Sequence, residues 1–236
     1  MSASALPPAS APLAGRVLLV TGAGAGLGRA TAIAAAKGGA TVVLLGRTIK
    51  KLEATYDAIA EAGAAQAAIV PLNLNGASYL DYENLAETMA RQYGRLDGLV
   101  HCAAHFTGFM RLAELPLKDW LDGLQINLTA AYSLSRACLP LLEASSAGRV
   151  LFVTDVAAKT PKAYQGIYGV SKAAIEALCS TWALETASTH PALKFSTFNP
   201  GPMRTGLRLK GWAGDVAEAI PPPEAAAQKL LASLWS

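Results

Sequence analysis

The segment Thr21-Gly-Ala-Gly-Ala-Gly-Leu-Gly28 connects a short apolar run to an alanine-rich segment of helical period. Glycines between a strand and a helix let the backbone approach a pyrophosphate, because no Cβ stands in the way and the N-terminus of the helix favours an anion. A tight turn that binds no ligand is the alternative. We predict a phosphate-binding loop whose cofactor contacts are Gly22, Gly24, Gly26, Leu27 and Gly28.

Around this loop, apolar runs rich in β-branched residues alternate with segments of helical period, which is typical of βα units around a parallel sheet. The predicted strands are Arg16–Val20, Thr41–Leu45, Ala67–Leu72, Gly98–His101, Arg149–Thr154 and Lys194–Phe198. The predicted helices are Leu27–Lys37, Ile49–Ala62, Tyr79–Tyr93, Leu117–Ala144 and Gln165–Thr189. After Phe198 we expect a loop that covers a site, and a last short helix after Pro221-Pro222-Pro223. The pattern predicts an α/β Rossmann fold: a doubly wound parallel sheet of six strands, with seven as the alternative, flanked by helices.

Composition narrows the domain organisation and the partners. The length of 236 residues and the hydrophobic content of 52% predict a single domain over residues 16–236, preceded by a flexible arm over residues 1–15. The net charge of +3 is scattered and favours no nucleic acid partner, and no apolar segment is typical of a signal peptide or a membrane span. Cys102, Cys138 and Cys179 are too far apart for a disulfide framework or a zinc site, which predicts a cytoplasmic protein without a metal.

The end of the second predicted strand, Leu45-Gly46-Arg47-Thr48, carries a cation and no acid. In dinucleotide-binding folds an acidic side chain near this place binds the 2′-hydroxyl of NAD, whereas an arginine accommodates the 2′-phosphate of NADP. A solvated arginine at the end of a strand is the alternative. We therefore expect Arg47 to favour NADP(H) over NAD(H).

Tyr168-Gly-Val-Ser-Lys172 places a phenol and an ammonium four residues apart, on one face of a predicted helix. A nearby ammonium stabilises phenolate, so we expect Lys172 to lower the pKa of Tyr168 from the ordinary value of about 10. Such a tyrosine can exchange a proton with a carbonyl oxygen. The spacing alone also fits an exposed helix pair without function.

Together, Thr21-Gly-x-x-x-Gly-x-Gly28, Asn127, Tyr168-x-x-x-Lys172 and Pro200-Gly201 followed by Thr205 resemble the short-chain dehydrogenase/reductase family. The resemblance covers residue 16 to about residue 210. The Leu-Leu-Gly-Arg and Leu-Asp-Gly-Leu-Val-His stretches also resemble a bacterial subgroup of uncharacterised cytoplasmic oxidoreductases of the YciK type.

The resemblance implies hydride transfer between NADP(H) and an unidentified alcohol or carbonyl substrate, with Tyr168 as the acid/base. It implies that Lys172 binds the nicotinamide ribose, and that Asn127 holds a proton-relay water at a kink of its helix. Pro200, Gly201 and Thr205 are implied to contact the cofactor on its nicotinamide side. A homodimer through the fourth and fifth helices is also implied. Without the resemblance, Asn127 is more typical of a residue that packs between helices and whose side-chain hydrogen bonds are made by the protein itself.

Three places depart from the family pattern. Asp155 stands thirteen residues before Tyr168, where the family usually has a serine that polarises the substrate oxygen. Asn73 replaces an aspartate after the third strand, and His101-Cys102-Ala103-Ala104 replaces Asn-Asn-Ala-Gly after the fourth, where Cys102 loses hydrogen bonds that tie the strands together. The residues at these two places that we expect to contact the cofactor are Asn73, Leu74, Ala103 and Ala104.

These departures leave two functions open. One is an active enzyme in which Asp155 is catalytic, and the other is an NADP(H)-binding relative in which catalysis is impaired. The candidate substrate pocket follows the carboxyl ends of the strands, where α/β sheets bind ligands, and ordinary packing is the alternative for its residues. It comprises His105, Phe106, Phe109, Met110, Tyr164 and Trp212.

Overall fold

The computed structural model describes residues 12–212, 214 and 219–235. At its centre is a six-stranded parallel sheet with the strand order β3-β2-β1-β4-β5-β6. The strands are β1 (Val17–Thr21), β2 (Thr41–Gly46), β3 (Ala67–Pro71), β4 (Gly98–His101), β5 (Arg149–Val153) and β6 (Lys194–Phe198). The direction of winding reverses between β1 and β4, which is the doubly wound arrangement. The predicted fold class and the predicted six strands are confirmed.

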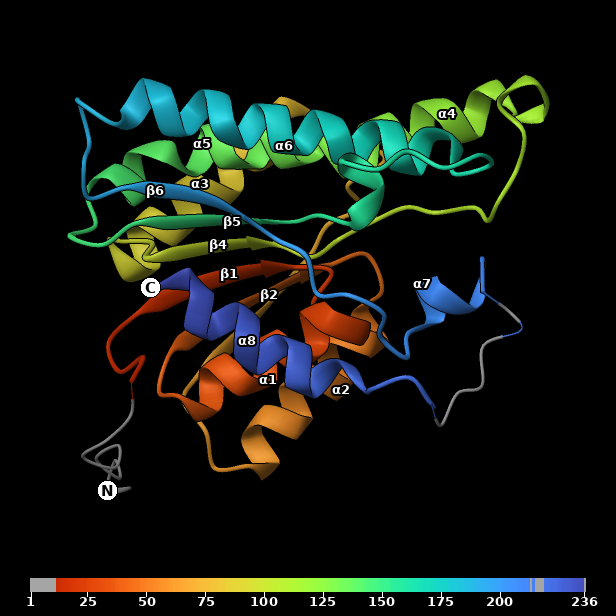
Figure 1. Ribbon diagram of the computed structural model, residues 1–236. Helices are drawn as coiled ribbons and strands as arrows, with labels where there is room; N and C mark the ends of the chain where they lie inside the picture. The colour runs from red at the N-terminus through yellow and green to blue at the C-terminus, as the bar shows by residue number, and fades with distance from the viewer. Residues whose placement is uncertain (1–11, 213, 215–218, 236) are drawn as a thin grey trace.

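Helices cover both faces of the sheet (Figure 1). One face carries α1 (Gly26–Lys37), α2 (Ile49–Glu61) and α8 (Pro223–Leu234), and the other carries α3 (Tyr79–Tyr93), α4 (Leu117–Leu124), α5 (Ala130–Glu143) and α6 (Gly166–Thr186). The short helix α7 (Gly206–Leu209) follows β6, and single 3₁₀ turns occupy Leu112–Glu114 and Val156–Ala158.

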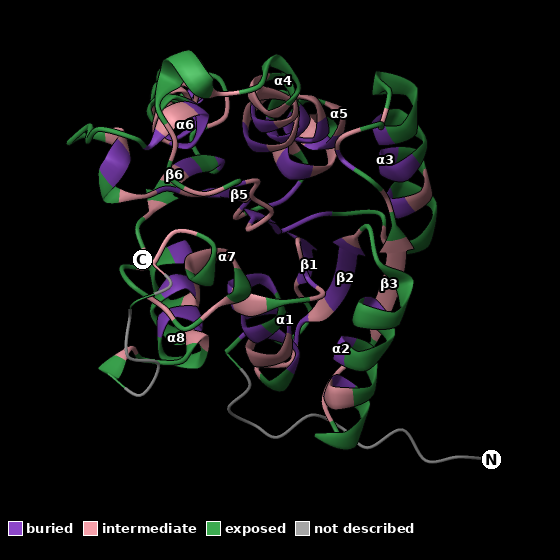
Figure 2. Cartoon of the chain, turned by 90° about the vertical axis from the view of Figure 1, so that its right-hand side faces the viewer, coloured by how far each residue is buried: buried purple, intermediate pink, exposed green. Residues whose placement is uncertain are grey.

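The core has two layers because successive side chains of a strand point to opposite faces of the sheet. In β1, Leu18 and Val20 pack with α1 and α8, whereas Val17 and Leu19 pack with α3, α5 and α6. All five residues of β1 are buried. Figure 2 shows that the buried residues line the strands and the inner faces of the helices. The strands therefore read as nearly continuous apolar runs, as expected for a sheet covered on both faces.

Local signals explain where α3 begins and ends. Ser78 and Asp81 form a capping box, in which each side chain accepts a hydrogen bond from the other residue's backbone N–H. Gly94 ends the helix in the left-handed conformation with φ of 67°, which a glycine adopts without steric cost. The predicted bounds Tyr79–Tyr93 are confirmed.

The prediction of one continuous helix over Leu117–Ala144 is wrong. A π-helical turn over Gln125–Thr129 separates α4 from α5. Such a turn inserts one residue into the helical repeat without changing which residues are apolar, so periodicity does not reveal it. The other predicted elements differ from the observed ones by at most three residues at their ends.

Most of the arm expected over residues 1–15 lies outside the described residues. Within the described part, the side chain of Leu13 is buried in the core, and its backbone N–H donates to the oxygen of Gly38 at 2.9 Å. The packed chain therefore starts a few residues before Arg16. In the part of the chain that the structure describes, no helix is both long enough and apolar enough to cross a membrane.

Candidate active site

A cleft of about 560 Å³ opens at the carboxyl edge of the sheet, where the segments after the strands meet. Its volume lies in the usual range for ligand sites. Every residue predicted to contact the cofactor lines this one cleft, although these residues come from six separate segments. They are Gly22, Gly24, Gly26, Leu27, Gly28, Arg47, Asn73, Leu74, Ala103, Ala104, Tyr168, Lys172, Pro200, Gly201 and Thr205.

The glycine loop owes its shape to close packing as well as to its place at the cleft. Gly22 has φ of 67°, and a Cβ there would lie 3.0 Å from the backbone of Ala103. A Cβ on Gly28 would lie 2.4 Å from the oxygen of Gly22. Both positions therefore exclude a side chain.

The N-terminus of α1 fits a pyrophosphate. Ala25, at the N-cap, provides no side-chain hydrogen bond to the helix, and the first turn contains no acidic residue. The backbone N–H groups of this turn are therefore not capped from within by a side chain, and the helix dipole favours an anion here.

Cations gather where the end of β2 meets this loop. Arg47 is exposed and lines the cleft, and Lys51, on the first turn of α2, lines it as well. Sequence reasoning missed Lys51, although a cation on the first turn of the predicted helix, four residues after Arg47, was a usable signal. The two side chains give this end of the cleft the positive charge that a 2′-phosphate needs.

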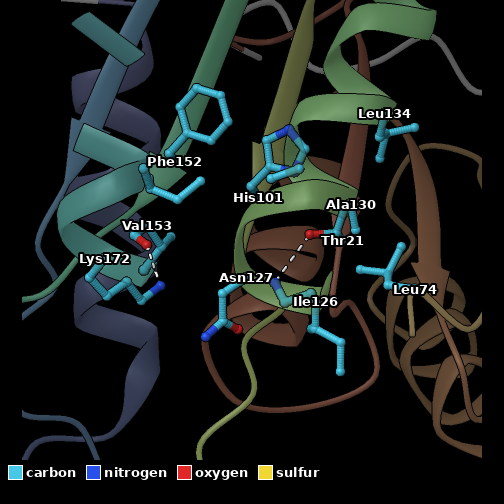
Figure 3. A pocket seen from close by; sticks show the side chains of 13 residues that line it. Thr21, Leu74, His101, Ile126, Asn127, Ala130, Leu134, Phe152, Val153 and Lys172 are labelled. Carbon is cyan, nitrogen blue, oxygen red and sulfur yellow. Dashed lines mark hydrogen bonds between the residues drawn. The ribbon is translucent and has the colours of Figure 1, made fainter. Parts of the chain in front are cut away.

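Tyr168 and Lys172 lie near the start of α6 and point toward the cleft. Tyr168 is 7% exposed and Lys172 is 4% exposed. The Lys172 Nζ atom lies 5.6 Å from the centre of the tyrosine ring, and it donates to the carbonyl oxygen of Val153 at 2.6 Å (Figure 3). The predicted pair is thus assembled in the predicted place.

The expected effect of Lys172 on Tyr168 is wrong for the ligand-free protein. Burial, and then the nearby carboxylate of Asp155, raise the pKa of Tyr168 above its ordinary value. Burial also lowers the pKa of Lys172 to about 8, while Asp155 acts in the opposite direction. Tyr168 is therefore a protonated phenol at neutral pH, suited to donate a proton rather than to accept one.

Asp155 faces Tyr168 from the end of β5. Its Oδ2 atom lies 3.5 Å from the phenol oxygen, at the outer limit of a hydrogen bond, and its Oδ1 atom accepts a 2.9 Å hydrogen bond from the N–H of Ala157. The neighbouring Thr154 hydroxyl instead donates to Glu176 at 2.9 Å. Thr154 therefore does not replace the missing serine, and the residue beside the phenol is the carboxylate of Asp155.

Asn127 lies in the π-helical turn, but outside the cleft. Its Oδ1 atom accepts from the N–H of His105 at 2.6 Å, and its Nδ2 atom donates to the oxygen of His105 at 3.0 Å and to Ser171 Oγ at 2.9 Å. The side chain therefore braces the loop after β4 against α6, as a satisfied packing residue does. The expected interruption of the helix at Asn127 is present as the π-helical turn.

A cavity of about 10 Å³ lies behind Lys172, lined among others by Thr21, His101 and Asn127 (Figure 3). Its volume is close to that of a single water molecule. Burial, and then the charge of Lys172, lower the pKa of His101 to about 3, so its ring is neutral. His101 Nε2 lies 2.8 Å from Ser135 Oγ, and its ring stacks on Phe152.

The loss of amide hydrogen bonds expected at Cys102 is offset nearby. Thr21 Oγ1 accepts a 3.1 Å hydrogen bond from the N–H of Ala103, which joins the ends of β1 and β4. All three cysteines are free.

Aromatic rings form one wall of the cleft. The Phe106 ring lies 5.0 Å from the Tyr168 ring and 5.8 Å from that of Trp212. His105, Phe106 and Trp212 line the cleft as predicted. Phe109, Met110 and Tyr164 are not among its lining residues: Phe109 packs behind Trp212, and the Met110 N–H donates to the oxygen of Tyr164.

The segment around α7 closes one side of the cleft. Thr205 Oγ1 caps α7 by accepting from the N–H of Arg208, and the Thr205 methyl group lies opposite Gly26. Arg208 and Lys210 also line the cleft, and Arg208 lies over the Trp212 ring at 4.6 Å. Sequence reasoning missed both cations, because a four-residue helix after a turn-rich segment leaves no periodic signal.

Among the described residues, His105, Asp119 and Asp122 form a group of possible metal ligands beside the cleft. The sequence predicted no metal site. The ligand atoms of His105, Asp119 and Asp122 lie within 4.8 Å of one another. Asp122 already accepts hydrogen bonds from Lys118 and Asn75. Its negative charge is thus compensated by protein groups.

Comparison with known proteins gives the same family along most of the chain. The family model for short chain dehydrogenases matches residues 16–214. The uncharacterized oxidoreductase YciK of Escherichia coli is 33% identical over 208 residues, which cover 88% of this chain and 81% of that protein.

Solved structures agree with this assignment. A short chain dehydrogenase from Pseudomonas syringae is 39% identical, with a TM-score of 0.88, over 95% of this chain and 90% of that one. One from Escherichia coli CFT073, complexed with NADPH, is 33% identical, with a TM-score of 0.88, over 97% of this chain and 92% of that one. The chain therefore belongs to the short-chain dehydrogenase family of oxidoreductases.

Proposed function

We propose that this protein is an NADP(H)-dependent oxidoreductase that transfers a hydride between the cofactor and a small alcohol or carbonyl substrate. The observation that carries the proposal is that one cleft contains the glycine loop, Arg47 and the Tyr168–Lys172 pair. The NADPH complex of a relative that is 33% identical supports the choice of cofactor. Family membership supports the reaction type.

In this proposal the glycine loop and the N-terminus of α1 hold the pyrophosphate, while Arg47 and Lys51 hold the 2′-phosphate. Pro200, Gly201 and Thr205 contact the nicotinamide end, and Lys172 binds the ribose beside it. The reduced nicotinamide supplies the hydride when it is bound. The site residues of this chain then bind the substrate, exclude water and move a proton.

Tyr168 is the proposed proton donor in carbonyl reduction. Its raised pKa keeps the phenol protonated, and its position against Phe106 limits access of water. Asn127 does not contact the substrate in this proposal. Its side chain holds the loop that carries His105 in place through two hydrogen bonds to the His105 backbone. If a water relays protons to Tyr168, it must bind the main chain near Asn127, because the amide side chain is already engaged.

Asp155 separates two versions of the proposal. A protonated Asp155 would donate a hydrogen bond to the carbonyl oxygen, as the usual serine does, and the protein would be active on carbonyl compounds. An ionised Asp155 would repel the negative charge that develops on that oxygen, and carbonyl reduction would be impaired.

Two measurements test the proposal together. NADPH and NADH are titrated against the protein by fluorescence, and a panel of aldehydes and ketones is screened by following the absorbance of the reduced cofactor. Tight NADPH binding with turnover of any panel member supports an active enzyme. NADPH binding without turnover supports the impaired relative, and failure to bind either cofactor overturns the proposal.

The proposal includes a homodimer through the fourth and fifth predicted helices, which correspond to α4–α5 and α6. Leu117 and Leu121 on α4 are 71% and 54% exposed, and Leu184 on α6 is 79% exposed. Burial of such leucines against a second copy would be favourable. Light scattering at two concentrations tests the dimer. A reducing, cytoplasmic location is also proposed, since all three cysteines are free thiols.

A further inference from the structure

The carboxylate of Asp155 is held beside the reacting position. Its Oδ1 atom accepts a hydrogen bond from the N–H of Ala157 and thereby caps the short helix Val156–Ala158. Its Oδ2 atom is left 3.5 Å from the phenol oxygen of Tyr168. The hydrogen bond to Ala157 therefore holds the carboxylate beside the position of a substrate atom that Tyr168 would contact.

Asp155 is the only carboxylate among the described residues that line the cleft. The buried ammonium of Lys172 lies in the same site, but its hydrogen bond goes to the carbonyl oxygen of Val153. Arg208 and Lys210 line the cleft from the segment after β6, whereas Asp155 follows β5 and Tyr168 lies on α6. Asp155 therefore places the one negative charge of the described cleft lining next to the phenol, where Lys172 supplies the neighbouring positive charge.

A carboxylate at this place favours one class of hydride acceptor over another. A carbonyl oxygen becomes negative as hydride arrives, which a neighbouring carboxylate opposes. An iminium ion, with its C=N⁺ bond, is positive before the reaction, and a carboxylate attracts it. We propose that this site binds and reduces iminium ions, in addition to carbonyl compounds, with Asp155 as the residue that holds the cation. This inference rests on the proposed use of NADP(H).

The reaction balances without a proton donor. The C–H bond at the reduced nicotinamide breaks and a C–H bond forms at the iminium carbon, so two electrons and one hydrogen move together. The π pair of the C=N bond becomes the lone pair of the amine nitrogen. The positive charge leaves the substrate and is carried by the oxidised nicotinamide. Because no proton moves, the raised pKa of Tyr168 is no obstacle.

The aromatic wall fits the same ligand class. Phe106, which is 2% exposed, lies 5.0 Å from the Tyr168 ring, and the Trp212 ring lies next to it. The faces of such rings attract organic cations as well as apolar groups. Arg208 already lies over the Trp212 ring and Lys172 over that of Tyr168. The wall therefore suits the hydrocarbon part of such a cation, while Asp155 attracts its charge.

Binding is tested with a permanent cation that cannot react. N,N-dimethyltetrahydroisoquinolinium is titrated into the protein by calorimetry, with and without saturating NADP⁺, for the wild type and for Asp155→Asn. The asparagine keeps the acceptor that caps Ala157 but removes the charge. We expect the variant to bind the cation about tenfold more weakly. Asp57→Asn, an exposed change on α2, is the matched control and should bind like the wild type.

Turnover is tested with N-methyldihydroisoquinolinium, a permanent iminium ion, and with α-tetralone, whose carbonyl carbon occupies the same ring position. With NADPH at neutral pH, the wild type should show a lower KM for the iminium ion than for the ketone. Asp155→Asn should raise the KM for the iminium ion about tenfold relative to the KM for the ketone.

Two results would overturn the inference while leaving the proposed function intact. One is ketone reduction by a wild type that neither binds nor reduces the cations. The other is cation affinity that Asp155→Asn leaves unchanged. Absence of NADPH binding would instead overturn the proposed function and, with it, the reduction step of this inference.

Discussion

The phenol oxygen of Tyr168 lies 3.5 Å from Oδ2 of Asp155, so the proposed proton donor has a carboxylate as its neighbour. A carboxylate this close destabilises phenolate, and burial of the ring acts in the same direction. Proton release from Tyr168 is therefore harder than in a site where a serine stands in this position. Alcohol oxidation, which needs phenolate as the base, should suffer more than carbonyl reduction.

The first prediction concerns the pH dependence of carbonyl reduction. As pH rises through about 8, the value to which burial lowers the pKa of Lys172, this side chain loses the positive charge that favours the developing oxyanion, so kcat/KM should fall. Tyr168 and Lys172 of α6 are coupled electrostatically to Asp155, and Tyr168 keeps its proton over this range because its pKa is raised. A pH profile with an active carbonyl substrate checks this expectation.

Asp155→Ser tests the same relationship from the other side. The serine supplies a neutral donor, so kcat/KM at neutral pH should increase by about tenfold. The fall with pH should move to lower pH, because Asp155 raises the pKa of Lys172. The pKa of Tyr168, followed by ultraviolet difference titration, should decrease because one of its two causes is removed. A flat wild-type profile that Asp155→Ser leaves unchanged would show that Asp155 does not act on the reacting oxygen.

The second prediction concerns the catalytic pair. Tyr168→Phe removes the proton donor but keeps the ring that packs on Phe106, so carbonyl turnover should fall on the order of 10³-fold while NADPH affinity stays nearly unchanged. Lys172→Ala should lower both the turnover and the NADPH affinity, because it also removes the proposed contact with the nicotinamide ribose. Tyr56→Phe, on an exposed part of α2, is the control for loss of a phenol. Full activity of Tyr168→Phe on carbonyl compounds would rule out this mechanism.

The features of the fold that depend on residues close together in the sequence could be predicted. The apolar runs mark the strands because a covered sheet needs them, and the glycine spacing between a strand and a helix marks the loop. The spacing of Tyr168 and Lys172 follows from helix geometry alone. These features need no knowledge of what lies opposite each residue.

The remaining features depend on contacts between distant segments. The π-helical turn at Asn127 accompanies hydrogen bonds to His105 and Ser171, which are 22 and 44 residues away. The raised pKa of Tyr168 depends on burial by the folded chain and on Asp155 at the end of another element. Neither periodicity nor motif spacing contains the burial of Tyr168, which is the larger cause of its raised pKa, whereas the opposing effect of an ionised Asp155 on phenolate could be predicted.

The third prediction concerns cofactor choice. Arg47 lines the cleft at the end of β2 with no acidic residue beside it, so Arg47→Ala should weaken NADPH binding by about 1.5–3 kcal/mol and leave NADH binding almost unchanged. Fluorescence titration of both cofactors gives the ratio. Lys50→Ala, an exposed cation three residues away, is the matched control. An unchanged ratio in Arg47→Ala would mean that this arginine does not select the 2′-phosphate.

The last prediction concerns Asp97, whose buried carboxylate lies at the opposite edge of the sheet from the cleft. It accepts hydrogen bonds from Arg95, Ser145 and the backbone N–H of Val17. Burial by itself raises the pKa of Asp97, but these hydrogen bonds outweigh it and hold the pKa below the ordinary value. A carboxyl with a lowered pKa in the folded state stabilises the protein above its unfolded pKa, and this contribution is lost as pH falls through the folded value. Asp97→Ala should therefore reduce the free energy of unfolding at neutral pH by about 3 kcal/mol, and by less in acid, in urea titrations at both pH values. Glu87→Ala, which breaks an exposed pair with Arg91, should change it by less than about 0.5 kcal/mol, and an equally small effect of Asp97→Ala would contradict the role assigned to this carboxylate.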